Sequence, residues 1–419
     1  MNVLILSQHF WPETFRINEI AHSLRAAGCR VSVLTGQPNY PDGDVFPGYR
    51  AWRAGVEDYD GVPVYRVPLA PRGRSGALRL AGNYLSFLLS ASVAGPWLLR
   101  GRRFDVVFVY GTSPILQVLP ALVLRAFKGC AVVTWVQDLW PQSLQVTGYV
   151  RHPRVLAMVA GVVRWLYRRS DLLLVQSRGF LSSVQPMAGG TPVEVHPNPG
   201  EVAFERAPDG APALALEPGF NVVFAGNLGT VQALDTVVAA AALLRDEPHV
   251  RFVLVGSGSR GEALAAQAQR LGLANVAFPG RFPVDAMPGI LAQASALLVS
   301  LKRDDILAQT VPSKVQAYLA AGRPVIASLD GEGARVVEEA GAGIACPAED
   351  AQALADAVRR LAGAPPAELA AMGGRARAYY QTHFEPAMLA ERLARRFAQL
   401  AGVPPSAAPL PERIGSDHG

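Results

Sequence analysis

The stretch Pro312–Ser328, PSKVQAYLAAGRPVIAS, decides the fold of this chain. It opens with Ser313 and Lys314 at a predicted helix start, continues with small and apolar residues, and stops at Gly322. The apolar run at 324–327 that follows is typical of a buried strand. A lysine and a hydroxyl at a helix N-terminus suit an anion, because the free backbone N–H groups and the helix dipole favour negative charge there.

Two strand ends that carry glycine lie upstream of this helix. They are Val222–Gly229, VVFAGNLG, and Phe252–Gly258, FVLVGSG. Carboxyl ends of parallel strands meet at one edge of a sheet, so the three segments together predict a parallel sheet gathered around a phosphate-bearing ligand. Each segment taken singly is also consistent with an ordinary tight turn, in which glycine serves only the backbone geometry.

The composition places the chain among globular proteins of more than one domain. It has 419 residues, 50% of them hydrophobic and 17% charged, which is too long for one ordinary core and too apolar for a disordered chain. The three cysteines, Cys29, Cys130 and Cys346, are scattered, which fits a reducing cytoplasm rather than a disulfide framework. The first ten residues predict a buried strand and not a signal peptide.

The charge is unevenly divided along the chain. Residues 1–200 contain 20 Lys and Arg against 11 Asp and Glu, whereas residues 201–419 contain 19 against 23. A basic first half indicates an anionic surface or ligand on that side. Because no interleaved aromatic and basic pattern or nucleic-acid motif is present, we expect no nucleic-acid partner and favour a membrane surface.

The uncharged run Tyr84–Leu99 has two interpretations. It is shorter than the about 20 residues needed to span a bilayer, and arginines flank it on both sides. It is either a buried helix with a basic, solvated end, or a helix that faces lipid and dips into the membrane surface. The flanking residues are Arg72, Arg74, Arg79, Arg100, Arg102 and Arg103.

Strands alternate with helical segments in both halves of the chain, which predicts βαβ units and parallel sheets. The Pro-, Gly- and Ala-rich stretch 197–219 is the best candidate for a domain linker. We therefore expect an α/β fold with one domain at 1–200, a second at 201–400 whose last helix packs back on the first, and a disordered tail at 401–419.

Several motifs resemble glycosyltransferase family 4, which has the GT-B architecture of two Rossmann-like domains facing each other across a cleft. In the second half they are FAGNLG, VGSGS, FPGR and the opening stretch PSKVQAYLAAGRPVIAS. In the first half they are SQHFWPE at 7–13, PNYP at 38–41 and VQDLWP at 136–141. The resemblance covers about residues 1–400, and the branch it matches best is that of bacterial N-acetyl-L-fucosamine transferase-like proteins.

The resemblance implies a nucleotide-diphosphate sugar, and specifically a UDP-sugar, as donor. Transfer needs cations and N–H groups placed against the leaving diphosphate, and Lys314 is the first candidate. No Asp-X-Asp pattern suited to a bound divalent metal stands out, so we expect no metal and no other cofactor. The predicted donor-binding residues are Gly226, Asn227, Gly229, Gly256, Gly258, Arg281, Lys302, Gln309, Ser313, Lys314 and Glu332.

The chain departs from the family pattern at two places. The family carries two glutamates eight residues apart near this helix, but the matching positions hold Gln309 and Ala317. Gln309, Gln316 or Glu332 are the candidates to replace those carboxylates. Many members also carry a histidine where this chain has Gln137, and we expect Asp138 to substitute for it.

An acceptor hydroxyl needs positioning and a group that takes its proton. His9 and Asp138 each follow a predicted strand of the first half, and with Lys314 they are the predicted catalytic residues. The family motifs add four residues on the acceptor side, which are Glu13, Asn39, Tyr40 and Trp140.

The resemblance implies a glycosyltransferase of hexosyltransferase type that retains the anomeric configuration of the sugar. It would act on an undecaprenyl-linked or glycan acceptor in surface polysaccharide synthesis, and be attached peripherally to the inner face of the cell membrane. A nucleotide-sugar 2-epimerase is one alternative. A non-catalytic nucleotide-sugar-binding component of a polysaccharide assembly complex is another.

Overall fold

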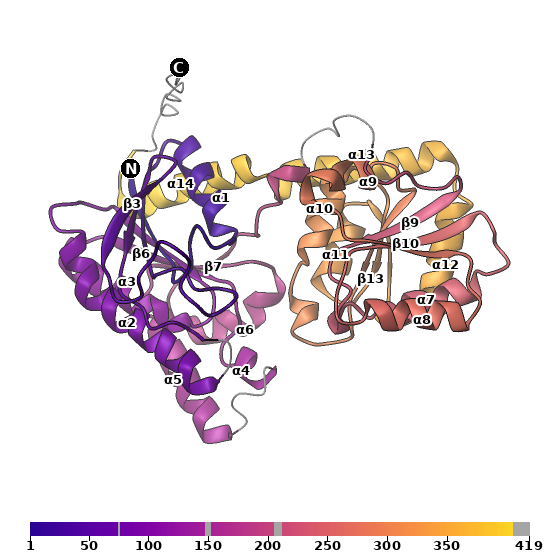
Figure 1. The fold of residues 1–419 in the computed structure, drawn as a ribbon. Coiled ribbons are helices and arrows are strands. Elements are labelled where there is room, and N and C mark those ends of the chain that lie inside the picture. Colours follow the sequence, from indigo (N-terminus) through magenta and orange to yellow (C-terminus); the bar gives the residue numbers. More distant parts are fainter. Residues whose placement is uncertain (74–75, 147–151, 205–211, 405–419) are drawn as a thin grey trace, which may run out of the picture. The chain divides into compact units, whose positions relative to one another are not determined.

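The computed structural model describes residues 1–73, 76–146, 152–204 and 212–404, and the chain forms two compact units (Figure 1). Most of the predicted tail therefore lies outside the described residues, as do Arg74 and part of the predicted linker. Unit 1 comprises Met1–Gln176, Phe180–His196 and the chain from Leu389 on, and unit 2 comprises Ser177–Gly179 and Pro197–Met388.

Unit 1 contains an eight-stranded sheet of order β3-β4-β2-β1-β5-β6-β7-β8. All neighbours are parallel except β3 and β4, which form an antiparallel hairpin at the edge. Several central strands are apolar along their whole length because helices cover both faces of the sheet. The strands are β1 (Asn2–Leu6), β2 (Arg30–Thr35), β3 (Gly55–Tyr59), β4 (Val62–Arg66), β5 (Val106–Gly111), β6 (Ala131–Val136), β7 (Leu172–Val175) and β8 (Val193–Val195).

Two groups of helices cover this sheet. Side chains of α2, α3, α5 and α6 form one core, and side chains of α1 and α14 form the other, with α14 alongside α1 in Figure 1. The chain thus returns to unit 1 at its end, where Phe397 packs against Phe108 with ring centroids 5.2 Å apart. The helices are α1 (Ile17–Ala26), α2 (Ala77–Leu98), α3 (Val118–Lys128), α4 (Gln142–Val146), α5 (Pro153–Tyr167), α6 (Gly179–Ala188) and α14 (Pro386–Ala401), with a 3-10 turn at Ile115–Gln117.

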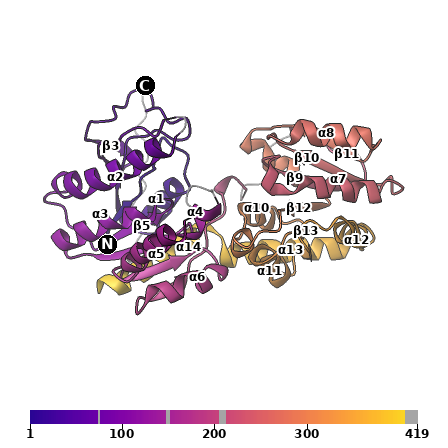
Figure 2. The ribbon, with the colours of Figure 1, turned by 90° about the horizontal axis from the view of Figure 1, so that it is seen from below.

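Unit 2 contains a six-stranded parallel sheet of order β11-β10-β9-β12-β13-β14. Helices α7, α8 and α12 cover one face and α9, α10, α11 and α13 cover the other, and Figure 2 shows the strands between them. The strands are β9 (Phe220–Ala225), β10 (Val250–Val255), β11 (Val276–Gly280), β12 (Ala296–Ser300), β13 (Val325–Ser328) and β14 (Gly343–Cys346). The helices are α7 (Leu234–Leu243), α8 (Gly261–Arg270), α9 (Met287–Leu291), α10 (Ser313–Ala321), α11 (Glu332–Glu339), α12 (Ala351–Ala362) and α13 (Pro366–His383), with 3-10 turns at 202–204, 230–232, 284–286 and 307–309.

The prediction of two Rossmann-like α/β domains is confirmed, because each unit is a mainly parallel sheet with helices on both faces. The sequence interpretation missed the β3–β4 hairpin. Its turn, Asp60-Gly61, has both residues at positive φ, +47° and +79°, and such an Asp-Gly pair is a strong hairpin signal.

Of the two interpretations of Tyr84–Leu99, the buried helix with a basic, solvated end does not hold, because one side of the helix is exposed. The run belongs to α2, whose two sides differ. Every fourth residue from Asn83 to Leu99 is buried, including Phe87 and Ala91, whereas the next apolar positions face outward. The outward positions are Leu85, Leu89, Val93 and Trp97, which are 50%, 63%, 77% and 67% exposed. No helix among the described residues combines the length and apolar character needed to cross a membrane.

The packing of α14 on unit 1 predicts that Phe397→Ala lowers the free energy of unfolding of that unit by about 3–4 kcal/mol, because it empties a fully buried aromatic site. All six tryptophans lie between residues 11 and 165, so urea unfolding followed by tryptophan fluorescence reports on unit 1. The exposed substitution Arg395→Ala on the same helix is the control, with a change below about 0.5 kcal/mol. Equal midpoints for the two variants would show that α14 does not stabilise unit 1.

Candidate active site

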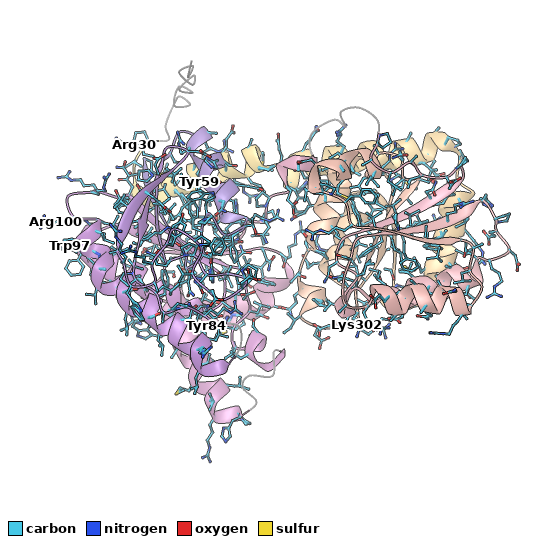
Figure 3. The ribbon with its side chains drawn as sticks, in the orientation of Figure 1. Arg30, Tyr59, Tyr84, Trp97, Arg100 and Lys302 are labelled. Atoms are coloured by element: carbon cyan, nitrogen blue, oxygen red, sulfur yellow. The ribbon has the colours of Figure 1, made fainter. Side chains whose placement is uncertain are left out.

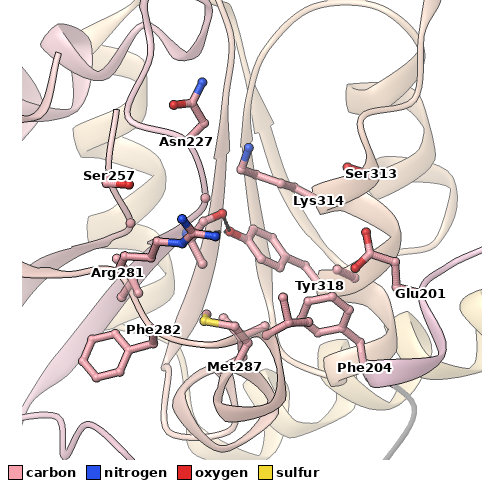
Figure 4. A pocket seen from close by; sticks show the side chains of 17 residues that line it. Glu201, Phe204, Asn227, Ser257, Arg281, Phe282, Met287, Ser313, Lys314 and Tyr318 are labelled. Carbon is pink, nitrogen blue, oxygen red and sulfur yellow. Dashed lines mark hydrogen bonds between the residues drawn. The ribbon is translucent and has the colours of Figure 1, made fainter. Parts of the chain in front are cut away.

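Unit 2 holds a pocket of about 420 Å³ at the carboxyl ends of β9, β10 and β11, beside the first turn of α10. This is the edge at which parallel sheets bind ligands. Figure 4 shows polar side chains along its upper part and aromatic and sulfur-containing side chains below. The labelled polar residues are Glu201, Asn227, Ser257, Arg281, Ser313 and Lys314, and the others are Phe204, Phe282, Met287 and Tyr318.

Two glycines form the backbone wall of the pocket. Gly226 and Gly256 have φ values of +140° and +141°, which side chains rarely tolerate. A Cβ on Gly256 would lie 1.8 Å from the carbonyl oxygen of Gly226, and a Cβ on Gly226 would lie 2.6 Å from Cε of Lys314. Only glycine therefore allows the two strand ends and the lysine to come this close together.

Lys314 is the main cation of the pocket. Its side chain is half-buried, and its Nζ lies 5.0 Å from the ring centroid of Phe224. Burial lowers the pKa of Lys314. Within the described part of the chain no carboxylate lies in ion-pair distance of its amine. A partly desolvated ammonium beside free helix N–H groups is suited to an anionic ligand.

Tyr318 fixes α10 against the end of β9. Its buried hydroxyl accepts a hydrogen bond from the backbone N–H of Ala225 at 2.8 Å, drawn as a dashed line in Figure 4. Burial raises the pKa of Tyr318, so the phenol stays protonated. Gln316 donates from Nε2 to the carbonyl of Asn198 at 2.7 Å. These bonds hold the first turn of α10, and with it Lys314, at the sheet edge.

Six of the predicted donor-binding residues line this pocket, and they are Gly226, Asn227, Gly256, Arg281, Ser313 and Lys314. Gly229 and Gly258 lie behind Asn227, because a Cβ on either would meet its side chain within 2.7 Å. Lys302, Gln309 and Glu332 lie outside the pocket lining.

The three outlying residues have other surroundings. Lys302 is exposed on unit 2 (Figure 3). The carbonyl of Gln309 accepts a hydrogen bond from Ser177 at 2.5 Å, and Glu332 pairs with Arg335 at 2.8 Å.

Sequence reasoning missed the apolar side of the pocket. Phe282 and Met287 follow β11, and Leu291 and Tyr318 come from α9 and α10. In sequence these residues look like ordinary core positions. Ala317, at the position of a missing family glutamate, also lines the pocket, which places that departure from the family pattern at the site itself.

Unit 1 has its own cluster of polar residues at the carboxyl ends of β1 and β2, around the buried carboxylate of Glu13. This side chain is 2% exposed and accepts hydrogen bonds from the backbone N–H groups of Phe10, Asn39 and Tyr40, at 3.2, 2.9 and 2.8 Å. It therefore ties the loop after β1 to the loop after β2. A buried carboxylate that accepts several hydrogen bonds is held in one orientation.

Glu13 also determines the chemistry of His9. Its two carboxylate oxygens lie 3.0 and 3.1 Å from Nδ1 of His9. A carboxylate only accepts, so we assign the proton to Nδ1, which leaves Nε2 as an acceptor in the neutral ring. The ring stacks on Phe15 at 5.0 Å and is tilted against Tyr40 at 5.6 Å. His9 is thus oriented as a proton acceptor at Nε2.

Asp138 and Trp140, after β6, meet at Ser113, after β5. The Oδ2 of Asp138 accepts hydrogen bonds from the backbone N–H and the hydroxyl of Ser113, both at 2.7 Å. The indole N–H of Trp140 donates to the same hydroxyl at 3.1 Å. Ser113 was missed in the sequence analysis. The neighbouring Gln137 is held by its backbone N–H on the carbonyl of Gly111.

Two parts of the chain match protein families. Residues 14–201 match the glycosyl transferase 4-like domain, and residues 219–363 match the glycosyl transferases of group 1. A putative colanic acid biosynthesis glycosyl transferase of Escherichia coli K12, WcaI, is 29% identical over 339 residues, which cover 77% of this chain and 82% of that protein.

Solved structures share the fold over the whole length. Sucrose-phosphate synthase of Thermosynechococcus elongatus has a TM-score of 0.69 at 18% identity, covering 96% of this chain and 99% of that one. HepE of Anabaena, in complex with UDP, has a TM-score of 0.66 at 15% identity, covering 95% and 100%. Fold and site together define a GT-B glycosyltransferase. The chain belongs to glycosyltransferase family 4 and is an enzyme of the hexosyltransferase type.

The contacts of Glu13 predict that Glu13→Ala lowers the free energy of unfolding of unit 1 by about 3 kcal/mol, because it leaves buried N–H groups and the His9 imidazole unpaired. Glu13→Gln, which keeps an acceptor oxygen, should lower the free energy of unfolding by less. Tryptophan fluorescence in urea measures both. Asp42→Ala, an exposed acidic position in the same unit, is the control. A Glu13→Ala midpoint equal to that of the control would exclude the anchoring role.

Proposed function

We propose that the unit 2 pocket binds a UDP-sugar and that the enzyme transfers its sugar to a lipid-linked or glycan acceptor in surface polysaccharide synthesis. The pocket carries the proposal. Its cations Lys314 and Arg281 suit a diphosphate, and its apolar side, with Phe282 and Met287, suits a nucleobase and ribose. The structural relative HepE binds UDP, and the colanic acid relative from Escherichia coli supports the polysaccharide role.

In the proposed reaction the bond between the anomeric carbon and the diphosphate oxygen breaks, and a bond to the acceptor oxygen forms. Lys314 and the N–H groups at the start of α10 stabilise the charge that builds on the leaving diphosphate. His9, oriented by Glu13, takes the proton of the acceptor hydroxyl at Nε2. Retention of the anomeric configuration and an N-acetylated deoxy sugar as substrate follow the family branch that the sequence resembles.

Lys314→Ala should lower the rate of sugar transfer by about a hundredfold or more while the protein stays folded, because the diphosphate loses its buried counter-charge. The measurement is UDP release from a panel of UDP-sugars, with and without acceptor, together with thermal stabilisation by UDP. Arg270→Ala, exposed on α8, is the control. Turnover and UDP binding near the wild-type level would overturn the role of Lys314.

The same assay separates the alternatives. A 2-epimerase would convert the UDP-sugar without an acceptor, and a binding component would be stabilised by UDP without turnover. Activity that persists in EDTA would agree with the prediction that no metal is needed, whereas restoration of lost activity by added Mg²⁺ or Mn²⁺ would contradict it.

Peripheral attachment to the inner membrane face forms part of the proposal. The outward side of α2, from Leu85 to Trp97, is apolar and ends beside Arg100, and Figure 3 shows Trp97 and Arg100 at one end of the helix. Such a surface inserts into the interfacial region while arginines contact anionic lipid. On α5, which covers the same face of the sheet, Met158 and Trp165 are also exposed, at 65% and 42%.

The double variant Leu85→Glu/Val93→Glu should remove most binding to vesicles of phosphatidylcholine and phosphatidylglycerol, because two carboxylates would have to enter the interface. Co-sedimentation measures it. Leu243→Glu/Leu271→Glu, at positions 45% and 42% exposed in unit 2, is the matched control. Equal sedimentation of the two variants would exclude α2 as the contact.

A further inference from the structure

A second pocket, of about 590 Å³, lies at the edge of the unit 1 sheet opposite to Glu13 and His9. Its lining comes from the amino-terminal ends of β1 and β2, at Asn2 and Arg30, and from Phe104 just before β5. The predicted reaction chemistry lies at the carboxyl ends of the strands, so this pocket is separate from it. Its charged side chains are those of Arg25, Arg30, Arg102 and Arg103, and we call it the arginine pocket.

Among the described residues, the four guanidinium groups have no carboxylate partner. Across the ranges that the structure describes, none of them lies within 4.0 Å of a carboxylate oxygen. Arg25 donates to the backbone carbonyl of Asp60, and Arg102 lies over the ring of Tyr65 at 5.3 Å. Lys128 adds a fifth positive charge beside the pocket. Like charges gathered in a hollow repel one another, and an anion would relieve that repulsion.

The backbone that carries these arginines is fixed. Gly61 and Gly101 line the pocket at φ values of +79° and +76°. A Cβ on Gly61 would lie 3.0 Å from Nη1 of Arg25, so glycine makes room for that side chain. Lys128 donates from Nζ to the carbonyls of Leu99 and Arg102, at 2.8 and 3.0 Å, which holds the turn after α2.

The pocket is continuous in sequence with the apolar side of α2. Trp97 ends that side, Arg100 follows it, and Arg102 and Arg103 enter the pocket within the next three residues. Figure 3 shows Trp97, Arg100 and Arg30 at the surface of unit 1. A lipid whose phosphate group occupied the pocket would therefore have its acyl chains beside exposed apolar side chains. This arrangement favours a lipid over a free phosphate as the ligand.

We infer that the arginine pocket binds the phosphate of an anionic membrane lipid headgroup and so sets where unit 1 sits on the membrane surface. The inference rests on the proposed membrane attachment. The inference adds a specific binding site to that attachment. In this site Arg25 and Arg30, from other segments, join the arginines that follow α2. Guanidinium groups suit this ligand because their paired N–H groups match phosphate oxygens.

The test compares Arg30→Gln/Arg103→Gln with Arg245→Gln/Arg270→Gln, which removes the same charge from exposed positions of unit 2. Full-length proteins are sedimented with vesicles of phosphatidylcholine alone and of phosphatidylcholine with phosphatidylglycerol. We expect the pocket variant to lose roughly 20-fold in binding to the anionic vesicles, and the control variant to bind like the wild type. Tryptophan fluorescence checks the fold of unit 1.

The outcomes distinguish lipid binding at the arginine pocket from membrane attachment through α2. If the pocket variant binds like its control while Leu85→Glu/Val93→Glu does not bind, the pocket inference is overturned and attachment through α2 stands. If the wild type does not bind either vesicle, attachment itself fails and the inference with it. Stabilisation by inorganic pyrophosphate that Arg30→Gln/Arg103→Gln abolishes, with unchanged vesicle binding, would assign the pocket to free phosphate and overturn the lipid ligand.

Discussion

The close approach of two strand ends in unit 2 is the constraint on which the candidate site depends. Gly226 and Gly256 meet with so little space that a single added carbon would overlap a carbonyl oxygen. Lys314 lies over the same point, held there by the hydrogen bond between Tyr318 and Ala225. Gly226 and Gly256 have only a hydrogen atom in place of a side chain. The pocket can therefore present backbone groups, the Lys314 ammonium and the N-terminus of α10 to one ligand.

Unit 1 uses a buried carboxylate for a comparable purpose. Glu13 receives three backbone N–H groups and the imidazole of His9, so it joins two loops and orients one titratable ring. The cost of burying its charge is offset only while all these donors remain in place. Residues that the sequence suggested as acceptor-side contacts, such as Asn39 and Tyr40, thus meet Glu13 through their backbone.

The positive charge of the first half is concentrated at particular places on the unit 1 surface. Arg100, Arg102 and Arg103 follow the exposed apolar side of α2, and Arg25 of α1 and Arg30 of β2 line the same pocket as Arg102 and Arg103. Unit 2, which carries the net negative half, keeps its cations Lys314 and Arg281 inside or beside the pocket. The surface role proposed for unit 1 and the ligand role proposed for unit 2 therefore rest on separate groups of cations.

The sequence by itself determined the α/β class, the family and the helix start at Lys314, because apolar periodicity, glycine positions and motif order are local properties. It did not determine which residues share a pocket. Lys302 and Gln309 lie near Lys314 in sequence but outside the pocket, whereas Arg281 reaches it from the loop after β11 and Met287 from the start of α9. The order of the strands in the sheet decides which of these residues share the pocket. That order depends on packing between segments that are far apart in the sequence. The exposure of Trp97 and the gathering of Arg30 with Arg103 were likewise decided only by the tertiary structure.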